Sequence, residues 1–301
     1  MNSSLTRRGL LRGGLAAGAA IAVGSALGCD AAESRAPHVP PLRLAYGGFA
    51  LGIQSFSLRH YTFEAALDIV RALGLTHVEL IPETRLGPIL FGEHLRVTES
   101  GAAIDAALAA CAQRGVAISA HGVNAMPDLA TAQRLLAFAQ RARIPVLTIA
   151  PSAELLPDLD ALCAAHPSVR LAIHNHGPHL PWETIDEIRG AIDGRHPNVG
   201  ACVDTGHFIR SAADPVEAIR TFGARVHGVH LKDFVEAGAF ADGCILGHGM
   251  LDLAAVFGAL REVEFGGALS LEYEENSEDV VPDLVACLEA ASDAAEQVRR
   301  G

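Results

Sequence analysis

The sequence predicts an α/β fold, a single-domain (β/α)8 barrel, and three observations lead to this prediction. After about residue 41, short apolar runs alternate with stretches of helical periodicity. The apolar runs are hydrophobic throughout, which is typical of parallel strands buried on both faces. Eight such units in about 260 residues match the usual size of this barrel. A doubly wound open sheet is the alternative, and it is disfavoured because no Gly-rich phosphate loop follows the first strand.

The elements follow one another in a regular order. The expected strands are Leu51–Ser57, His77–Ile81, Ala117–Gly122, Val146–Ala150, Arg170–Asn175, Gly200–Asp204, Val226–Leu231 and Ala268–Tyr273. The expected helices are Phe63–Leu73, Ala102–Gln113, Leu129–Arg141, Leu155–Ala165, Trp182–Ile192, Pro215–Phe222, Leu253–Glu262 and Val280–Val298. Thr62 and Asp252 are candidate N-caps, and Gly74 follows a helix end. The longer stretches Leu86–Thr98 and Val235–Met250 follow strands two and seven, so we expect them over the C-terminal face of the barrel.

The charge of the chain excludes one class of partner. The formal net charge is −12, from 23 basic and 35 acidic side chains. An acidic surface repels phosphate backbones, which argues against a nucleic-acid partner. All basic residues but one are Arg, and the single Lys is Lys232. Arg cannot replace Lys where a titratable amine is needed, so Lys232 is a candidate functional residue.

The N-terminus is expected to be a targeting segment. Thr6-Arg7-Arg8-Gly9-Leu10-Leu11 resembles the twin-arginine export signal, and the mildly apolar run that follows is too short to be a membrane span. We expect a signal peptide over residues 1–28, a tether over 29–47 and the barrel over 48–301. Ala26-Leu27-Gly28-Cys29 is similar to a degenerate lipobox, so a lipid on Cys29 would be the only membrane link. This predicts a periplasmic or lipid-anchored protein.

The remaining cysteines are interpreted as small buried residues rather than as a disulfide framework or a zinc cage, because they show no close pairing and are odd in number. They are Cys111, Cys163, Cys202, Cys244 and Cys287.

Ligand-type side chains stand where the last four strands end. His174, Asp204, His230 and Glu272 come from successive strands, whose C-terminal ends meet on one face of a barrel. Imidazole nitrogen and carboxylate oxygen bind divalent metals, and this mixed set suits Mn, Co, Fe or Zn better than Mg. Burying four such groups would be costly unless they satisfied one another or a metal. The sequence therefore predicts a metal site made of these four residues.

Other strand-end residues have both a functional and a structural interpretation. Gln54, Glu79 and His121 are candidate substrate-binding residues, or else polar side chains that fill the barrel mouth, with Glu79 bonded to a loop or to Arg85. Side chains two apart on a strand point to the same side, so His176 accompanies His174 and Lys232 accompanies His230. Lys232 beside a metal would have a lowered pKa, or would instead pair with Asp233 or Glu272.

As a set, five motifs resemble those of the xylose isomerase-like barrel superfamily, and specifically of its sugar phosphate isomerase/epimerase group. They are Ala172-Ile173-His174-Asn175-His176, Val203-Asp204-Thr205-Gly206-His207, Val229-His230-Leu231-Lys232-Asp233, Gly247-His248-Gly249 and Leu271-Glu272-Tyr273. The resemblance implies a metal held by Glu, Asp, His and Glu, the last three matching Asp204, His230 and Glu272. His174 stands where the family has its first Glu. The pair of metal-bound glutamates that family epimerases use for proton transfer is therefore incomplete here.

The resemblance implies a metal-dependent isomerase or epimerase that acts on a sugar or keto-sugar through an enolate. In this hypothesis the metal polarises the carbonyl, Glu272 removes the neighbouring proton, and His207, His176 or Lys232 returns it or stabilises the enolate. Two alternatives stay open. One is a lyase or dehydratase acting on keto-sugars, keto-inositols or 3-keto-glycosides, and the other is a non-catalytic exported barrel that binds a sugar. The endonuclease branch of the superfamily is disfavoured because it needs a basic DNA-binding face.

Overall fold

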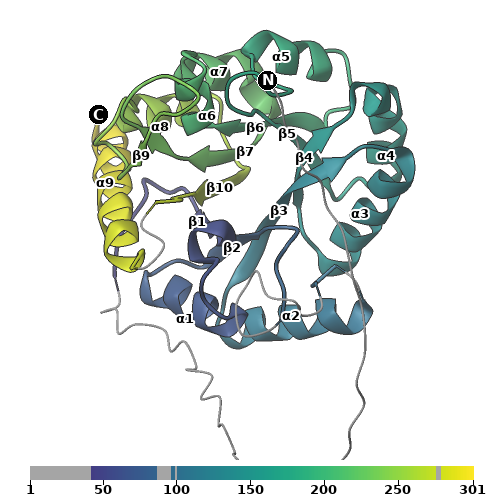
Figure 1. Ribbon diagram of the computed structural model, residues 1–301, viewed down its shortest axis with the longest axis horizontal. Coiled ribbons are helices and arrows are strands. Elements are labelled where there is room, and N and C mark those ends of the chain that lie inside the picture. The colour runs from purple at the N-terminus through teal and green to yellow at the C-terminus, as the bar shows by residue number, and fades with distance from the viewer. Residues whose placement is uncertain (1–41, 87–95, 99, 276–278) are drawn as a thin grey trace, which may run out of the picture. The chain divides into compact units, whose positions relative to one another are not determined.

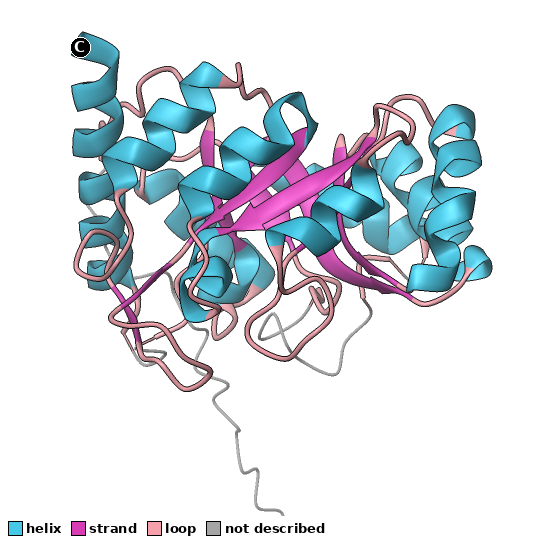
Figure 2. Cartoon of the chain, turned by 90° about the horizontal axis from the view of Figure 1, so that it is seen from above, coloured by secondary structure: helices cyan, strands magenta, loops and turns pink. Residues whose placement is uncertain are grey.

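A computed structural model describes residues 42–86, 96–98, 100–275 and 279–301, and in them the predicted barrel is confirmed. The twin-arginine segment, Cys29 and most of the tether lie outside the described residues, as do residues 87–95 of the first long loop. Figure 1 shows the strands in a central ring with the helices around it, and Figure 2 shows the same arrangement from the side. Among the described residues, every helix is too short or too polar to cross a lipid bilayer.

Eight parallel strands close the barrel in the order β1-β10-β7-β6-β5-β4-β3-β2. The strands are β1 (Leu51–Gln54), β2 (His77–Leu80), β3 (Ala117–Met126), β4 (Val146–Pro151), β5 (Arg170–His174), β6 (Val199–Asp204), β7 (Val226–Leu231) and β10 (Ala268–Leu271). The α-helices are α1 (Phe63–Ala72), α2 (Gly101–Gln113), α3 (Leu129–Ala142), α4 (Leu159–Ala165), α5 (Ile185–Ile192), α6 (Thr205–Arg210), α7 (Pro215–Phe222), α8 (Leu253–Glu262) and α9 (Val281–Arg300). Short 3-10 helices are η1 (Ser55–Leu58), η2 (Ala153–Asp158) and η3 (Gly223–Arg225).

The helix boundaries follow the chemistry that the sequence predicts. The side chain of Thr62 accepts a hydrogen bond from the amide of Ala65 and so caps α1, and Asp252 caps α8 in the same way through Ala255. Gly74, at a φ of 76°, ends α1 where a side chain would meet the carbonyl of Leu42.

Several elements differ from the expectation: β3 extends to Met126 instead of Gly122, α5 begins at Ile185 instead of Trp182, and three further differences bear on the site. The first strand stops at Gln54, because the Gln54 side chain accepts the amide of Phe56 and starts η1 instead. A short helix, α6, begins directly after β6, where the sequence pattern predicts only a loop. The second long loop contains a two-stranded antiparallel hairpin of β8 (Asp233–Phe234) and β9 (Gly243–Cys244).

The interior of the barrel is lined by small side chains at one level and by polar ones above it. Most of the hydrophobic core lies between the strands and the helices, whereas Ala120, Val146, Ala172, Cys202 and Ala268 form a separate small cluster. Strand alternation places the ligand-type residues on the same side as this cluster, since Ala172 precedes His174 by two and Cys202 precedes Asp204 by two. The apolar layer thus forms the floor of a polar site at the carboxyl ends of the strands.

Candidate metal centre

Four ligand-type side chains from four neighbouring strands meet at the carboxyl end of the barrel. His174, Asp204, His230 and Glu272 each offer one ligand atom, and these atoms lie within 4.8 Å of one another. Nδ1 of His230 lies 3.0 Å from Oε2 of Glu272 and 3.2 Å from Nε2 of His174. Oδ2 of Asp204 lies 3.6 Å from Nε2 of His174 and 3.7 Å from Nδ1 of His230. The cluster brings together the residues that the sequence predicts.

The two oxygens of Asp204 have different partners. Oδ1 accepts the amide of His207 and thereby caps α6. Oδ2 is buried and makes no hydrogen bond; it lies 3.4 Å from the Lys232 ammonium and faces the other three ligand-type atoms. The buried carboxylates of Asp204 and Glu272 share this one ammonium, and burying two carboxylates is costly unless their charge is fully compensated. The residues present therefore fit a divalent metal held by two imidazoles and two carboxylates.

Two side chains, those of Asn175 and Thr205, form hydrogen bonds with the backbone of the neighbouring strand and fix the spacing of the strands around Asp204. The Asn175 side chain accepts the amide of Asp204 at 2.7 Å and donates to its carbonyl at 2.9 Å. The Thr205 hydroxyl donates to the Lys232 carbonyl at 2.7 Å and accepts the Lys232 amide at 2.9 Å. These contacts hold the ends of β5, β6 and β7 in register.

Glu79 lies beneath His230, on its far side from the cluster. Oε2 of Glu79 lies 3.0 Å from Nε2 of His230, and the carboxylate also accepts the hydroxyls of Thr148 at 2.7 Å and Ser270 at 2.8 Å. With Nε2–H directed at Glu79, Nδ1 of His230 is the atom available to a metal. Burial by itself lowers the pKa of His230, but the groups around it, Glu79 among them, outweigh burial and raise that pKa well above its ordinary value. A metal in the cluster would replace the proton on Nδ1.

Lys232 borders the cluster on the side of Glu272. Its ammonium lies 3.1 Å from Oε2 of Glu272, 3.4 Å from Oδ2 of Asp204 and 2.9 Å from Oε1 of Glu274. Burial alone would lower the pKa of Lys232, but these carboxylates raise it. The expectation of a lowered pKa concerns Lys232 beside a bound metal and stays a prediction; without a metal, the three carboxylates determine the direction of the shift. The predicted pairing with Glu272 is confirmed.

His176 and His207 flank the cluster on the side of His174. The ring centres of His176 and His207 lie 5.0 and 5.6 Å from that of His174, and Nε2 of His207 lies 3.9 Å from Oδ2 of Asp204. Burial lowers the pKa of His176 to about 4 and that of His207 to about 3. Both imidazoles are therefore neutral near pH 7.

The three candidate substrate-binding residues each contact another part of the protein. Glu79 supports His230, and Gln54 donates to the carbonyl of Gly122 at 2.9 Å. His121 is fully buried, with its ring 4.9 Å from that of Phe138 on α3. The reason is strand register: Glu79 pairs with Ala120, so His121 points to the opposite side of β3. Their predicted contact with a substrate stays untested, and each has a structural partner here.

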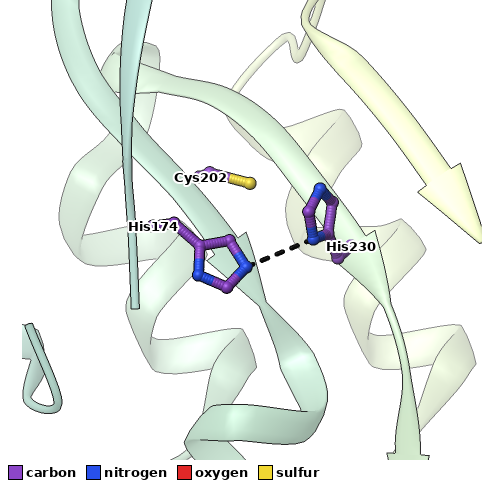
Figure 3. Close-up of side chains that lie close together, drawn as sticks. All are labelled: His174, Cys202 and His230. Atoms are coloured by element: carbon purple, nitrogen blue, oxygen red, sulfur yellow. Dashed lines mark hydrogen bonds between the residues drawn. The ribbon is translucent and has the colours of Figure 1, made fainter. Parts of the chain in front are cut away.

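Two further residues at the site have roles that the sequence reasoning missed. From the sequence, Cys202 is expected to be a small buried residue. Figure 3 shows it beside His174 and His230, and its sulfur could bind an ion together with those two imidazoles. Its spacing of two from Asp204 is the signal that could have found it. Asp233 accepts the amides of Gly247, Gly249 and Leu251, so it anchors the Gly247-His248-Gly249 loop instead of pairing with Lys232.

Comparison with known proteins places this geometry in context. An inosose dehydratase from Clostridium botulinum is 30% identical over 133 residues, which are 38% of this chain and 43% of that protein. A 3-oxo-isoapionate decarboxylase from Pectobacterium atrosepticum is 29% identical over 133 residues, covering 40% and 48% of the two chains. The chain thus spans less than half the length of the curated relatives it matches. The solved structure of IolI protein with a zinc atom superposes with a TM-score of 0.68 at 16% identity, covering 83% of this chain and 99% of that one.

A family model matches three quarters of the chain. The model describes a xylose isomerase-like TIM barrel and matches residues 67–291. This range contains seven of the eight barrel strands and all four residues of the ligand-type cluster. The chain belongs to the xylose isomerase-like TIM barrel family.

Proposed function

We propose that this protein is a metal-dependent enzyme that enolises a keto-sugar, with isomerase or epimerase activity. The observation that carries the proposal is the buried cluster of His174, Asp204, His230 and Glu272, in which Oδ2 of Asp204 makes no hydrogen bond. When bound there, a divalent metal supplies a Lewis acid that polarises a substrate carbonyl. The dehydratase relative and the zinc in the IolI protein support the same kind of chemistry.

Different residues around the cluster would remove the proton and stabilise the enolate. A neutral imidazole, His176 or His207, or the carboxylate of Glu272 would remove the proton next to the carbonyl. Lys232, held protonated by its carboxylate neighbours, would stabilise the negative charge that develops on the enolate oxygen. The contacts of its ammonium with Asp204, Glu272 and Glu274 support a role for Lys232 in proton donation and charge stabilisation.

Elimination is the second candidate outcome of the same enolate, and one observation favours it. His174 stands at the first ligand position, so the cluster holds one glutamate instead of two. An epimerase must remove a proton from one face of a carbon and return it on the other, whereas β-elimination removes one proton from carbon and delivers one to the departing oxygen, for which the Lys232 ammonium is available. A lyase or dehydratase acting on a keto-inositol or a 3-keto-glycoside would therefore need fewer proton-transfer groups at this site than an epimerase.

The experiment that separates these outcomes compares substrates in the presence and absence of a chelator. Purified protein is incubated with free ketoses and with 3-keto-glycosides, and the products are identified by NMR in deuterated water. Solvent deuterium at the carbon next to the carbonyl, dependent on metal, supports enolisation. Epimers without elimination would contradict the lyase outcome, and a chelator-insensitive protein that incorporates no deuterium would leave only the sugar-binding alternative.

Export belongs to the same proposal. The Arg7-Arg8 pair supports delivery by the twin-arginine route to the periplasm, with Cys29 as a lipid-attachment residue. Replacing Arg7 and Arg8 together by Lys should retain the protein in the cytoplasm of a host with that route. Cell fractionation measures this, and unchanged export of the double variant would contradict it.

A further inference from the structure

An apolar groove lies beside the metal-ligand cluster on the carboxyl side of the barrel. It has a volume of about 380 Å³ and is formed by the ends of β3 and β4 and the loop after β5. Its main side chains are Met126, Pro127, Pro151, His176, Leu180 and Trp182. Leu180 is 53% exposed, which is unusual for a large apolar side chain in this protein.

The groove adjoins the cluster at His176. The His176 ring lines the groove, and its centre lies 5.0 Å from that of His174. Nδ1 of His176 lies 3.2 Å from the carbonyl of Pro181, which also lines the groove. A molecule bound at the cluster would therefore lie about one imidazole ring away from the groove.

Trp182 is fixed in place at the groove. Its indole nitrogen donates to the carbonyl of Pro151 at 3.1 Å, and its ring packs partly against the hydrophobic core. An indole held in this way offers an apolar surface without losing side-chain freedom when a ligand binds. Rigid aromatic surfaces of this kind are common in small-molecule sites.

No described residue that lines the groove is charged. Its polar members are Ser152, whose hydroxyl donates to Pro127, and His176. The cations nearest the cluster are already engaged: Lys232 binds three carboxylates, and Arg210 donates to the carbonyls of Gly238 and Ala239. The described side chains of the groove therefore provide no cation for a phosphate group, so the part of a substrate that enters the groove is uncharged.

We infer that the groove binds an uncharged apolar substituent attached to the sugar that reacts at the cluster, so that the substrate is a glycoside with an apolar aglycone. This inference rests on the proposed function and narrows its substrate class. The sugar would place its carbonyl and hydroxyl at the cluster, and the aglycone would lie against Trp182 and Leu180. A free ketose or a keto-inositol has no group to fill the groove.

Trp182 is the only tryptophan of the chain, so its fluorescence reports directly on the groove. The metal-loaded full chain is titrated with phenyl β-D-glucoside, methyl β-D-glucoside and cellobiose, none of which needs to react. We expect the phenyl glucoside to bind at least about tenfold more tightly than the methyl glucoside. Leu180→Glu should remove this preference, while Leu129→Glu, at another exposed leucine outside the groove, should keep it.

Equal binding of the phenyl and methyl glucosides, or a preference that survives Leu180→Glu, would overturn the inference. Cellobiose binding as tightly as the phenyl glucoside would also overturn it, because the groove would then take a second sugar. The same variants are next assayed with the 3-keto derivatives of the phenyl and methyl glucosides. A phenyl preference in binding without any turnover contradicts the proposed function alone, whereas turnover without that preference contradicts the groove assignment alone.

Discussion

Glu79 and His230 form a buried pair in which Oε2 of the carboxylate lies 3.0 Å from Nε2 of the imidazole. Both side chains are inaccessible to solvent, and Thr148 and Ser270 complete the shell of Glu79. A carboxylate behind a ligand histidine fixes which nitrogen faces the metal and makes that nitrogen a better donor. Glu79 is thus a positioning residue for the candidate metal centre, although the sequence alone makes it a candidate substrate contact.

Glu79→Gln should weaken divalent metal binding by about tenfold to a hundredfold, because the amide cannot carry the negative charge that supports His230. Competition with a chromophoric chelator measures the affinity. Glu83→Gln, a nearby glutamate outside the cluster, serves as the matched control and should bind metal normally. Equal affinities for the two variants would show that Glu79 does not support the centre.

Lys232→Met should leave metal binding at least as tight as in the natural chain, because it removes a positive charge 3.1 Å from Glu272 and 3.4 Å from Asp204. Turnover should fall by about a hundredfold or more, because the enolate loses its ammonium partner. Isothermal titration with metal and a steady-state assay test the two parts separately. A loss of metal binding would instead make Lys232 a structural member of the cluster.

His174→Glu should restore the pair of glutamates that the family resemblance implies. A carboxylate still ligates a divalent metal, so the metal should remain bound. The ratio of epimerised to eliminated product should rise, since a second carboxylate becomes available for proton transfer. Product analysis by NMR measures the ratio, and an unchanged ratio would mean that His174 does not determine the outcome.

The buried His121 should make the free energy of unfolding depend on pH, independently of the metal centre. Burial lowers its pKa from 6.5 to about 4 in the folded state. The unfolded chain therefore takes up the proton first, and stability is lost as the pH falls from 6.5 towards 4. The loss from this one group at pH 4.5 is on the order of 2 to 3 kcal/mol.

His121→Leu should remove that loss, because leucine does not titrate. Neither ring nitrogen of His121 has a hydrogen-bond partner, so the substitution breaks no bond of the side chain. Urea unfolding at pH 7 and pH 4.5 gives the difference in unfolding free energy for each protein. The control His60→Leu, at an exposed position, should behave like the natural chain, and an equal acid loss in the His121 variant would contradict the assignment.

The sequence predicts the fold well because the barrel depends on patterns that are local in the chain. Each buried strand and each amphipathic helix is visible as a run or a period, and caps such as Thr62 carry their own signature. The helix α6 was missed because its cap, Asp204, was interpreted only as a ligand, whereas its two oxygens serve both purposes. The hairpin β8–β9 pairs residues about ten positions apart, and no short sequence motif indicates this pairing.

The sequence also predicts the four-residue cluster from local patterns, but it does not predict how the side chains around the cluster are oriented. His174, Asp204, His230 and Glu272 all stand at strand ends, and a barrel brings strand ends together. The direction of His121 depends on the register between β2 and β3, which shifts between Val78 and Glu79. Register is set by pairing across the sheet, so the position of His121 near a strand end does not by itself give the side to which its ring points.

Metal content of the purified protein tests the central claim most directly. We expect elemental analysis to find about one divalent ion per chain, and we expect the thermal midpoint to fall when a chelator removes the ion. In Asp204→Asn the ion should be absent, and the chelator should leave the thermal midpoint unchanged. The control Asp105→Asn removes only a surface ion pair with Arg141 and should retain the metal. A natural chain that contains no metal, gains none from added Mn, Co, Fe or Zn, and melts at the same temperature with and without chelator would contradict the account.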